Sequence, residues 1–170
     1  FHPKMMPSIV IADPNLTVGL PANLTAATGF DSLTHALETY CVNNFFHPMA
    51  DGIACESIKL VFHNLENAFI NGEDIDARFC MLCSSLMAGV AFQKGLGAVH
   101  SLAHSIGGIY DIHHGLLNAI LLPYVLEYNK DFIEQKISNI AKILKIGTSF
   151  DDYMKWLLNF RKNLKIPNKL

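Results

Sequence analysis

The sequence has 170 residues, of which 51% are hydrophobic and 16% charged, and a formal net charge of −2. This composition supplies enough apolar side chains for one good-sized core and excludes a disordered chain. The lysines and arginines are scattered, which argues against nucleic-acid binding, because that needs a dense basic surface. The sequence has no unbroken run of 18 apolar residues, so it predicts no membrane-spanning helix.

The first residues resemble a strand. Residues 8–12 read Ser-Ile-Val-Ile-Ala, an apolar and β-branched run, but the sequence offers no clear second strand to pair with it. Because a lone strand is not a stable unit, we expect this run to belong to an upstream sheet.

From about residue 21 onward the apolar residues recur with helical spacing. The predicted helices span residues 22–42, 48–70, 73–92, 98–106, 116–129, 131–145 and 151–162. Asn71-Gly72 and Gly107-Gly108 are expected to end the second and fourth of these helices. Six or seven helices with short connections predict an all-α fold.

The four cysteines lie inside apolar helical stretches, and no basic-then-apolar leader precedes them. Reduced thiols in a cytoplasmic protein fit this pattern best. Cys80 and Cys83 form one C-x-x-C, but without a second pair we expect buried thiols rather than a zinc or redox site.

Asp31 and His35 stand four residues apart on a predicted helix, so their side chains share one face. His100 and His104 repeat this spacing, and His114 follows the next turn. One carboxylate with several imidazoles suits Fe(II), Zn(II), Co(II) or Ni(II) better than Mg²⁺ or Ca²⁺. From spacing alone, surface pairs and hydrogen-bonded core histidines stay equally open. No metal role is expected for His2, His47, His63 and His113.

Residues 95–97, Gly-Leu-Gly, begin like a dinucleotide-binding loop, but no strand precedes them and the last glycine of that motif is absent. We therefore expect these glycines to let the chain turn before the helix that carries His100 and His104.

Two longer motifs resemble the iron-dependent, group III alcohol dehydrogenases. They read AATGFDSLTHALE at residues 26–38 and GLGAVHSLAH at residues 95–104, and HHG at 113–115 with NAILLP at 118–123 continues the second. The similarity covers roughly residues 8–130. It implies the multi-helical metal-binding domain of the dehydroquinate synthase-like and iron alcohol dehydrogenase fold.

In that arrangement residues 1–20 are a remnant strand and hinge from an upstream nucleotide-binding α/β domain. Residues 21–170 then form the all-helical catalytic domain, with its C-terminal end incomplete. The resemblance further implies that the metal ligands are Asp31, His35, His100 and His114. Fe(II) is the expected metal ahead of Zn, Co or Ni, and His104 is expected to relay a proton or position the substrate.

The implied activity is hydride transfer between a small primary or secondary alcohol, or the matching aldehyde or ketone, and NAD(P). We expect the upstream domain to bind most of the NAD(P), this chain alone to be inactive, and the full-length protein to be a homodimer or larger homo-oligomer. Two alternatives remain: a glycerol dehydrogenase-like zinc enzyme with fewer protein ligands, and a non-catalytic metal-binding helical fragment.

Overall fold

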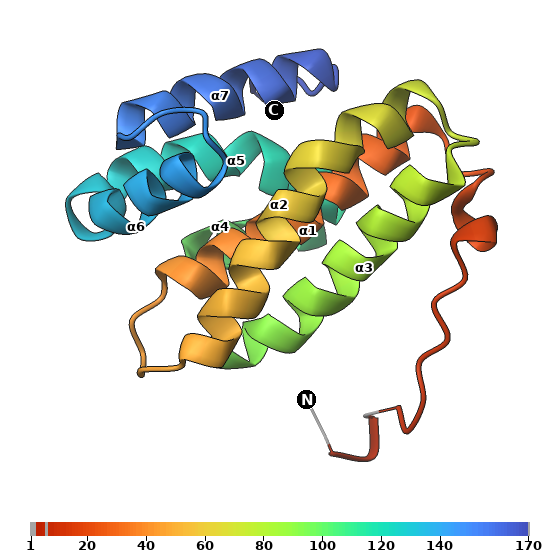
Figure 1. The fold of residues 1–170 in the computed structure, drawn as a ribbon, viewed down its shortest axis with the longest axis horizontal. Coiled ribbons are helices and arrows are strands. Elements are labelled where there is room, and N and C mark those ends of the chain that lie inside the picture. The colour runs from red at the N-terminus through yellow and green to blue at the C-terminus, as the bar shows by residue number, and fades with distance from the viewer. Residues whose placement is uncertain (1–2, 6, 170) are drawn as a thin grey trace.

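The computed structural model describes residues 3–5 and 7–169, and within them every regular element is a helix (Figure 1). This confirms the predicted all-α fold. The elements are η1 (Pro3–Met5), η2 (Pro14–Thr17), α1 (Ala22–Cys41), α2 (Pro48–Ile70), α3 (Ile75–Ala91), η3 (Phe92–Lys94), α4 (Ala98–Tyr110), α5 (His114–Tyr128), α6 (Lys130–Ile143) and α7 (Phe150–Asn163).

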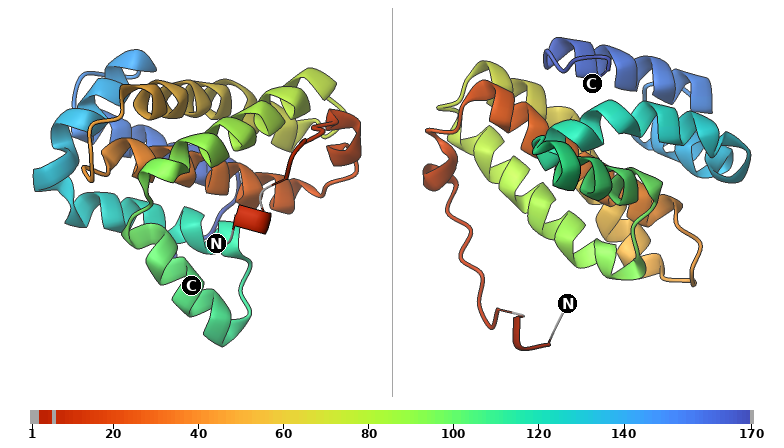
Figure 2. Two further views of the ribbon diagram at one scale, coloured as in Figure 1. Left: turned by 90° about the horizontal axis from the view of Figure 1, so that it is seen from below. Right: turned by 180° about the vertical axis from the view of Figure 1, so that it is seen from behind.

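Helix α1 is the centre of the molecule. It packs against α2, α3 and α5, while α6 and α7 pair at one end of the bundle and α4 projects beside α5 (Figures 1 and 2). Its residues Phe30, Leu33 and Leu37 are fully buried in the core. Each such side chain contributes about 1.5–3 kcal/mol, so the core fixes how α1 is rotated. That rotation turns Asp31 and His35 toward α4 and α5.

The start of α5 lies very close to α1. A Cβ added at Gly115 would stand 2.4 Å from the carbonyl oxygen of Ala27, a distance that real Cβ atoms do not reach. Only glycine therefore allows this approach. It brings His114, the neighbouring residue, beside Asp31.

Helix α4 is longer than the sequence predicted. It continues through Gly107 and Gly108 and ends at Tyr110. The next residue, Asp111, caps the helix and has a left-handed φ of 55°. A Cβ at Gly107 would lie 3.3 Å from Leu117, so this glycine serves the packing of α4 on α5 rather than breaking the helix. The predicted end at residue 106 is wrong because a helix held by packing tolerates glycine.

The expected strand at residues 8–12 does not form within the described residues. The segment is irregular, and Ile9, Val10 and Ile11 are exposed. No other strand is described that could supply the hydrogen bonds of a sheet, which is the physical reason. Its place in an upstream sheet stays a prediction.

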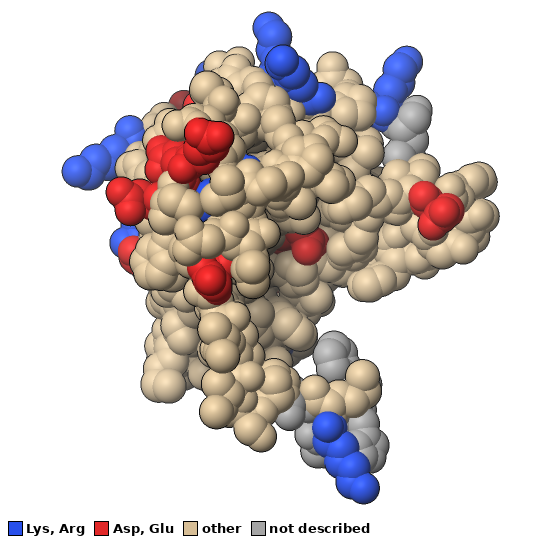
Figure 3. All heavy atoms as spheres, turned by 90° about the vertical axis from the view of Figure 1, so that its right-hand side faces the viewer, with Lys and Arg blue, Asp and Glu red and all other residues tan. Residues whose placement is uncertain are grey.

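One stretch, Ile75–Lys94, has the length and hydropathy of a membrane span, by length and composition only. Core helices of soluble proteins pass the same test, and this one packs along α2 and α1. Its buried Arg78 donates hydrogen bonds to Gly72 O, Thr25 Oγ1 and Leu20 O. The face shown in Figure 3 is mostly uncharged, with several acidic side chains gathered at its upper left and basic side chains mainly at its edges.

Candidate metal centre

Three predicted ligands meet where α1, α4 and α5 come together. Asp31 Oδ1 lies 3.5 Å from His100 Nε2 and 3.4 Å from His114 Nε2. One ligand atom from each residue lies within 4.8 Å of the other two. Two tetrahedral ligands at about 2.0–2.2 Å from one ion stand roughly 3.3–3.6 Å apart, so these separations fit a shared divalent cation.

His35 is close to this group but outside it. Its Nδ1 lies 2.9 Å from the backbone oxygen of Asp31 and 3.6 Å from Asp31 Oδ1, and its ring centroid is 4.2 Å from that of His100. The group of mutually close ligand atoms contains Asp31, His100 and His114. His35 as a fourth ligand therefore stays a prediction.

The surroundings set the charge of each group. Burial raises the pKa of Asp31, but its hydrogen bond with His100 and the charge of His35 outweigh this, so the net pKa is lowered. Burial lowers the pKa of His35 and His114, which favours the neutral imidazole that binds metals. Burial also opposes protonation of His100, yet Asp31 and Glu38 raise its pKa to about 9. A proton on His100 therefore competes with a metal ion.

Glu38, to which the sequence interpretation assigned no role, contacts the ring nitrogen of His100 that faces away from the other ligands. Its carboxylate is buried, with Oε2 lying 2.6 Å from His100 Nδ1 and Oε1 accepting a 2.7 Å hydrogen bond from the Val99 amide. A proton on Nδ1 points at Glu38 and leaves the lone pair of Nε2 for the centre. The spacing of Asp31, His35 and Glu38 on α1, four and then three residues apart, was the available signal.

Asn118 was also missed. It lies one turn after His114 on α5, is fully buried, and its side-chain nitrogen contacts the same three ligand atoms. An asparagine inside an apolar helix gives no sign of this in the sequence.

His104 lies at the exposed edge of the centre. Its ring centroid is 4.6 Å from that of His114 and 6.3 Å from that of His100. This position is compatible with a proton-transfer or positioning role, which stays a prediction.

The remaining histidines have local contacts. His47 Nδ1 accepts from the Ala50 amide at the start of α2, and His113 Nδ1 accepts from the Leu116 amide at the start of α5. His63 packs its ring against Phe62, and His2 lies outside the described residues.

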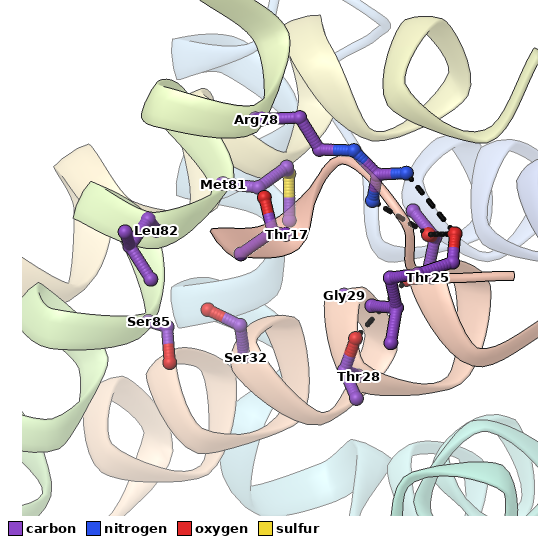
Figure 4. A pocket seen from close by; sticks show the side chains of 10 residues that line it. Thr17, Thr25, Thr28, Gly29, Ser32, Arg78, Met81, Leu82 and Ser85 are labelled. Atoms are coloured by element: carbon purple, nitrogen blue, oxygen red, sulfur yellow. Dashed lines mark hydrogen bonds between the residues drawn. The ribbon is translucent and has the colours of Figure 1, made fainter. Parts of the chain in front are cut away.

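A cavity of about 160 Å³ lies between η2, α1 and α3 (Figure 4). None of the residues that line it belongs to the candidate metal centre. The hydroxyls of Thr17 and Thr28 bond to backbone oxygens of their own turns, and the Arg78 guanidinium is directed toward Thr25 rather than into the cavity. The cavity therefore presents few free polar groups to a ligand.

A sequence model described as the Fe-containing alcohol dehydrogenase family, C-terminal, matches residues 25–170. The chain belongs to this family. The resemblance drawn from the motifs is thereby confirmed, and the candidate metal ligands all lie within the matched region.

Members of the family that are similar to this chain extend the comparison. The 1,3-propanediol dehydrogenase of Klebsiella pneumoniae is 45% identical over 142 residues, which cover 83% of this chain and 36% of the relative. The NAD-dependent methanol dehydrogenase of Bacillus methanolicus is 42% identical over 173 residues, covering 97% and 45%. A crystal structure of 1,3-propanediol oxidoreductase matches with a TM-score of 0.89 at 39% identity, covering 95% of this chain and 44% of that one. The chain thus spans less than half the length of these relatives.

Proposed function

We propose that this chain is the metal-binding catalytic domain of an NAD(P)-dependent dehydrogenase that interconverts small alcohols with aldehydes or ketones. The observation that carries the proposal is the convergence of Asp31, His100 and His114 on one point. Two relatives whose names specify a propanediol and methanol support the substrate class, and the second is named as NAD-dependent.

In this proposal Asp31, His100 and His114, joined by His35, hold one divalent cation, with Fe(II) as the expected metal. Such a cation supplies Lewis-acid polarisation of the substrate oxygen when it is bound. The lowered pKa of Asp31 keeps its carboxylate ionised at neutral pH, so it supplies the negative charge that the cation needs. Buried Glu38 keeps the His100 ring in one orientation.

His104 is proposed to carry the substrate's hydroxyl proton between the centre and solvent through a ring nitrogen. It is the exposed imidazole beside His114, and an imidazole ring can both donate and accept a proton. NAD(P) is proposed to be held mainly by an upstream nucleotide-binding domain, because no glycine-rich loop follows a strand in the residues described here.

The proposal is tested by NAD(P)H oxidation with a panel of small aldehydes, using metal-supplemented protein that includes any upstream domain. We expect turnover that disappears in Asp31→Asn together with the bound metal. Metal-loaded protein that turns over none of the panel would support a non-catalytic metal-binding module.

A zinc enzyme with three protein ligands is the second candidate. The position of His35 outside the group of mutually close ligand atoms favours it. Metal analysis of protein purified without air distinguishes the two, because one outcome is iron and the other zinc. The proposed homodimer or larger assembly is measured on the same sample by light scattering.

A further inference from the structure

Asn118 faces all three atoms of the metal centre at once. Its side-chain nitrogen Nδ2 lies 2.6 Å from Asp31 Oδ1 and 3.1 Å from Nε2 of both His100 and His114. The residue is fully buried on α5, one helical turn from His114. Its position is therefore fixed by the same packing of α5 on α1 that creates the centre.

The opposite end of the same amide has no partner. Asn118 Oδ1 is buried and accepts no hydrogen bond from the described residues. An unsatisfied buried acceptor destabilises a fold. Turning the amide around would place Oδ1 against the Asp31 carboxylate, where two acceptors repel each other. The side chain is thus oriented by donation to Asp31, even though its own oxygen stays unpaired.

Nδ2 carries two hydrogens and lies near three ligand atoms. The shortest contact commits one hydrogen to Asp31, and the second is directed between Nε2 of His100 and Nε2 of His114, each of which accepts it only when that nitrogen carries no proton of its own. When a cation takes the lone pairs of the two imidazoles, the hydrogen bond to Asp31 is the one that remains. An amide nitrogen has no available lone pair, so it orients a ligand instead of becoming one.

We propose that Asn118 is a positioning residue of the metal centre. Its Nδ2–H group donates to Asp31 and holds the carboxylate at the distance from His100 and His114 at which one divalent cation joins them. The inference rests on the proposed function, because it takes the centre to be a metal site.

The test is a titration with Co(II), followed by visible absorption, of the purified protein and two variants. Asn118→Leu keeps the branched shape of the side chain, with somewhat larger end groups, and removes the donor. Asn64→Leu is the matched control, since Asn64 is half-buried on α2 and donates only to Leu60 O of its own helix. Loss of an outer hydrogen bond to a metal ligand typically weakens binding 10–100-fold. We expect a Co(II) dissociation constant about 10–100-fold higher for Asn118→Leu, with shifted absorption bands, and no change for Asn64→Leu.

Circular dichroism and the melting temperature of the metal-free proteins show whether each variant is folded. If Asn118→Leu does not fold, Asn118→Ala replaces it with the same expected loss. Co(II) binding by the folded variant that equals or exceeds that of the unchanged protein would overturn the positioning role while leaving the proposed function standing. Absence of Co(II) binding by the unchanged protein would instead overturn both.

Discussion

Replacing Glu38 with Gln is expected to weaken metal binding about 30-fold without unfolding the chain. The carboxylate lies 2.6 Å from His100 Nδ1 and accepts 2.7 Å from the Val99 amide. A hydrogen bond to a charged group contributes about 1.5–3 kcal/mol, and glutamine keeps the shape but removes the charge. Losing about 2 kcal/mol at His100 corresponds to roughly 30-fold in the dissociation constant once that constant is corrected for the proton that His100 releases on binding, since about 1.4 kcal/mol is tenfold.

The measurement is isothermal titration of the metal-free protein with Zn(II). Glu56→Gln is the matched control, because Glu56 forms an exposed pair with Lys59 one turn away on α2. We expect the control to bind Zn(II) as the unchanged protein does. A folded Glu38→Gln protein whose dissociation constant stays within about threefold of the original would refute the reasoning, because the magnitude follows from the charge of Glu38.

Three further outcomes follow from the structure. His104→Ala should lower kcat/KM about 100-fold, the lower range of acid–base catalysis, with metal content unchanged; unchanged kcat/KM would remove the proton-transfer role. Gly115→Ala forces its Cβ against the Ala27 carbonyl, so the melting temperature should fall by roughly 3–8 °C, and an equal or higher value would contradict the close packing. Burial raises the pKa of Cys41 to about 12 and of Cys55 to about 11, so iodoacetamide at pH 8 should modify them at least about 100-fold more slowly in native than in unfolded protein, and more quickly as pH rises toward those values. Equal native and unfolded rates would show that the thiols are exposed.

The helices could be predicted where their own sequence determines them. Helix α2 begins at Pro48 and ends at Ile70 as its turn signals indicate. The end of α4 could not be predicted, because the role of Gly107 is to leave room for Leu117 of the next helix, and that packing is not visible in the local sequence pattern. Residues 8–12 have strand-like composition, yet a strand depends on a partner that the described chain does not contain.

In the candidate site, too, some residues could be predicted from local sequence, while others depend on how the helices pack. The i, i+4 spacing placed Asp31 and His35 on one helical face, and the motif resemblance added His100 and His114. The structure brings together three of these four residues, all but His35. Glu38 and Asn118 act across helix contacts. The spacing of Glu38 from Asp31 and His35 was a local signal, but it does not identify the partner of Glu38 on another helix. The packing of α1, α4 and α5 had to be known before either could be assigned.

The most direct test of the account is anomalous scattering at the iron and zinc edges from crystals of the metal-loaded protein. The account predicts one peak about 2.0–2.2 Å from Asp31 Oδ1, His100 Nε2 and His114 Nε2, with the edge identifying the element. A metal peak located elsewhere, or no peak between these three atoms in a crystal soaked with excess metal, would contradict the account.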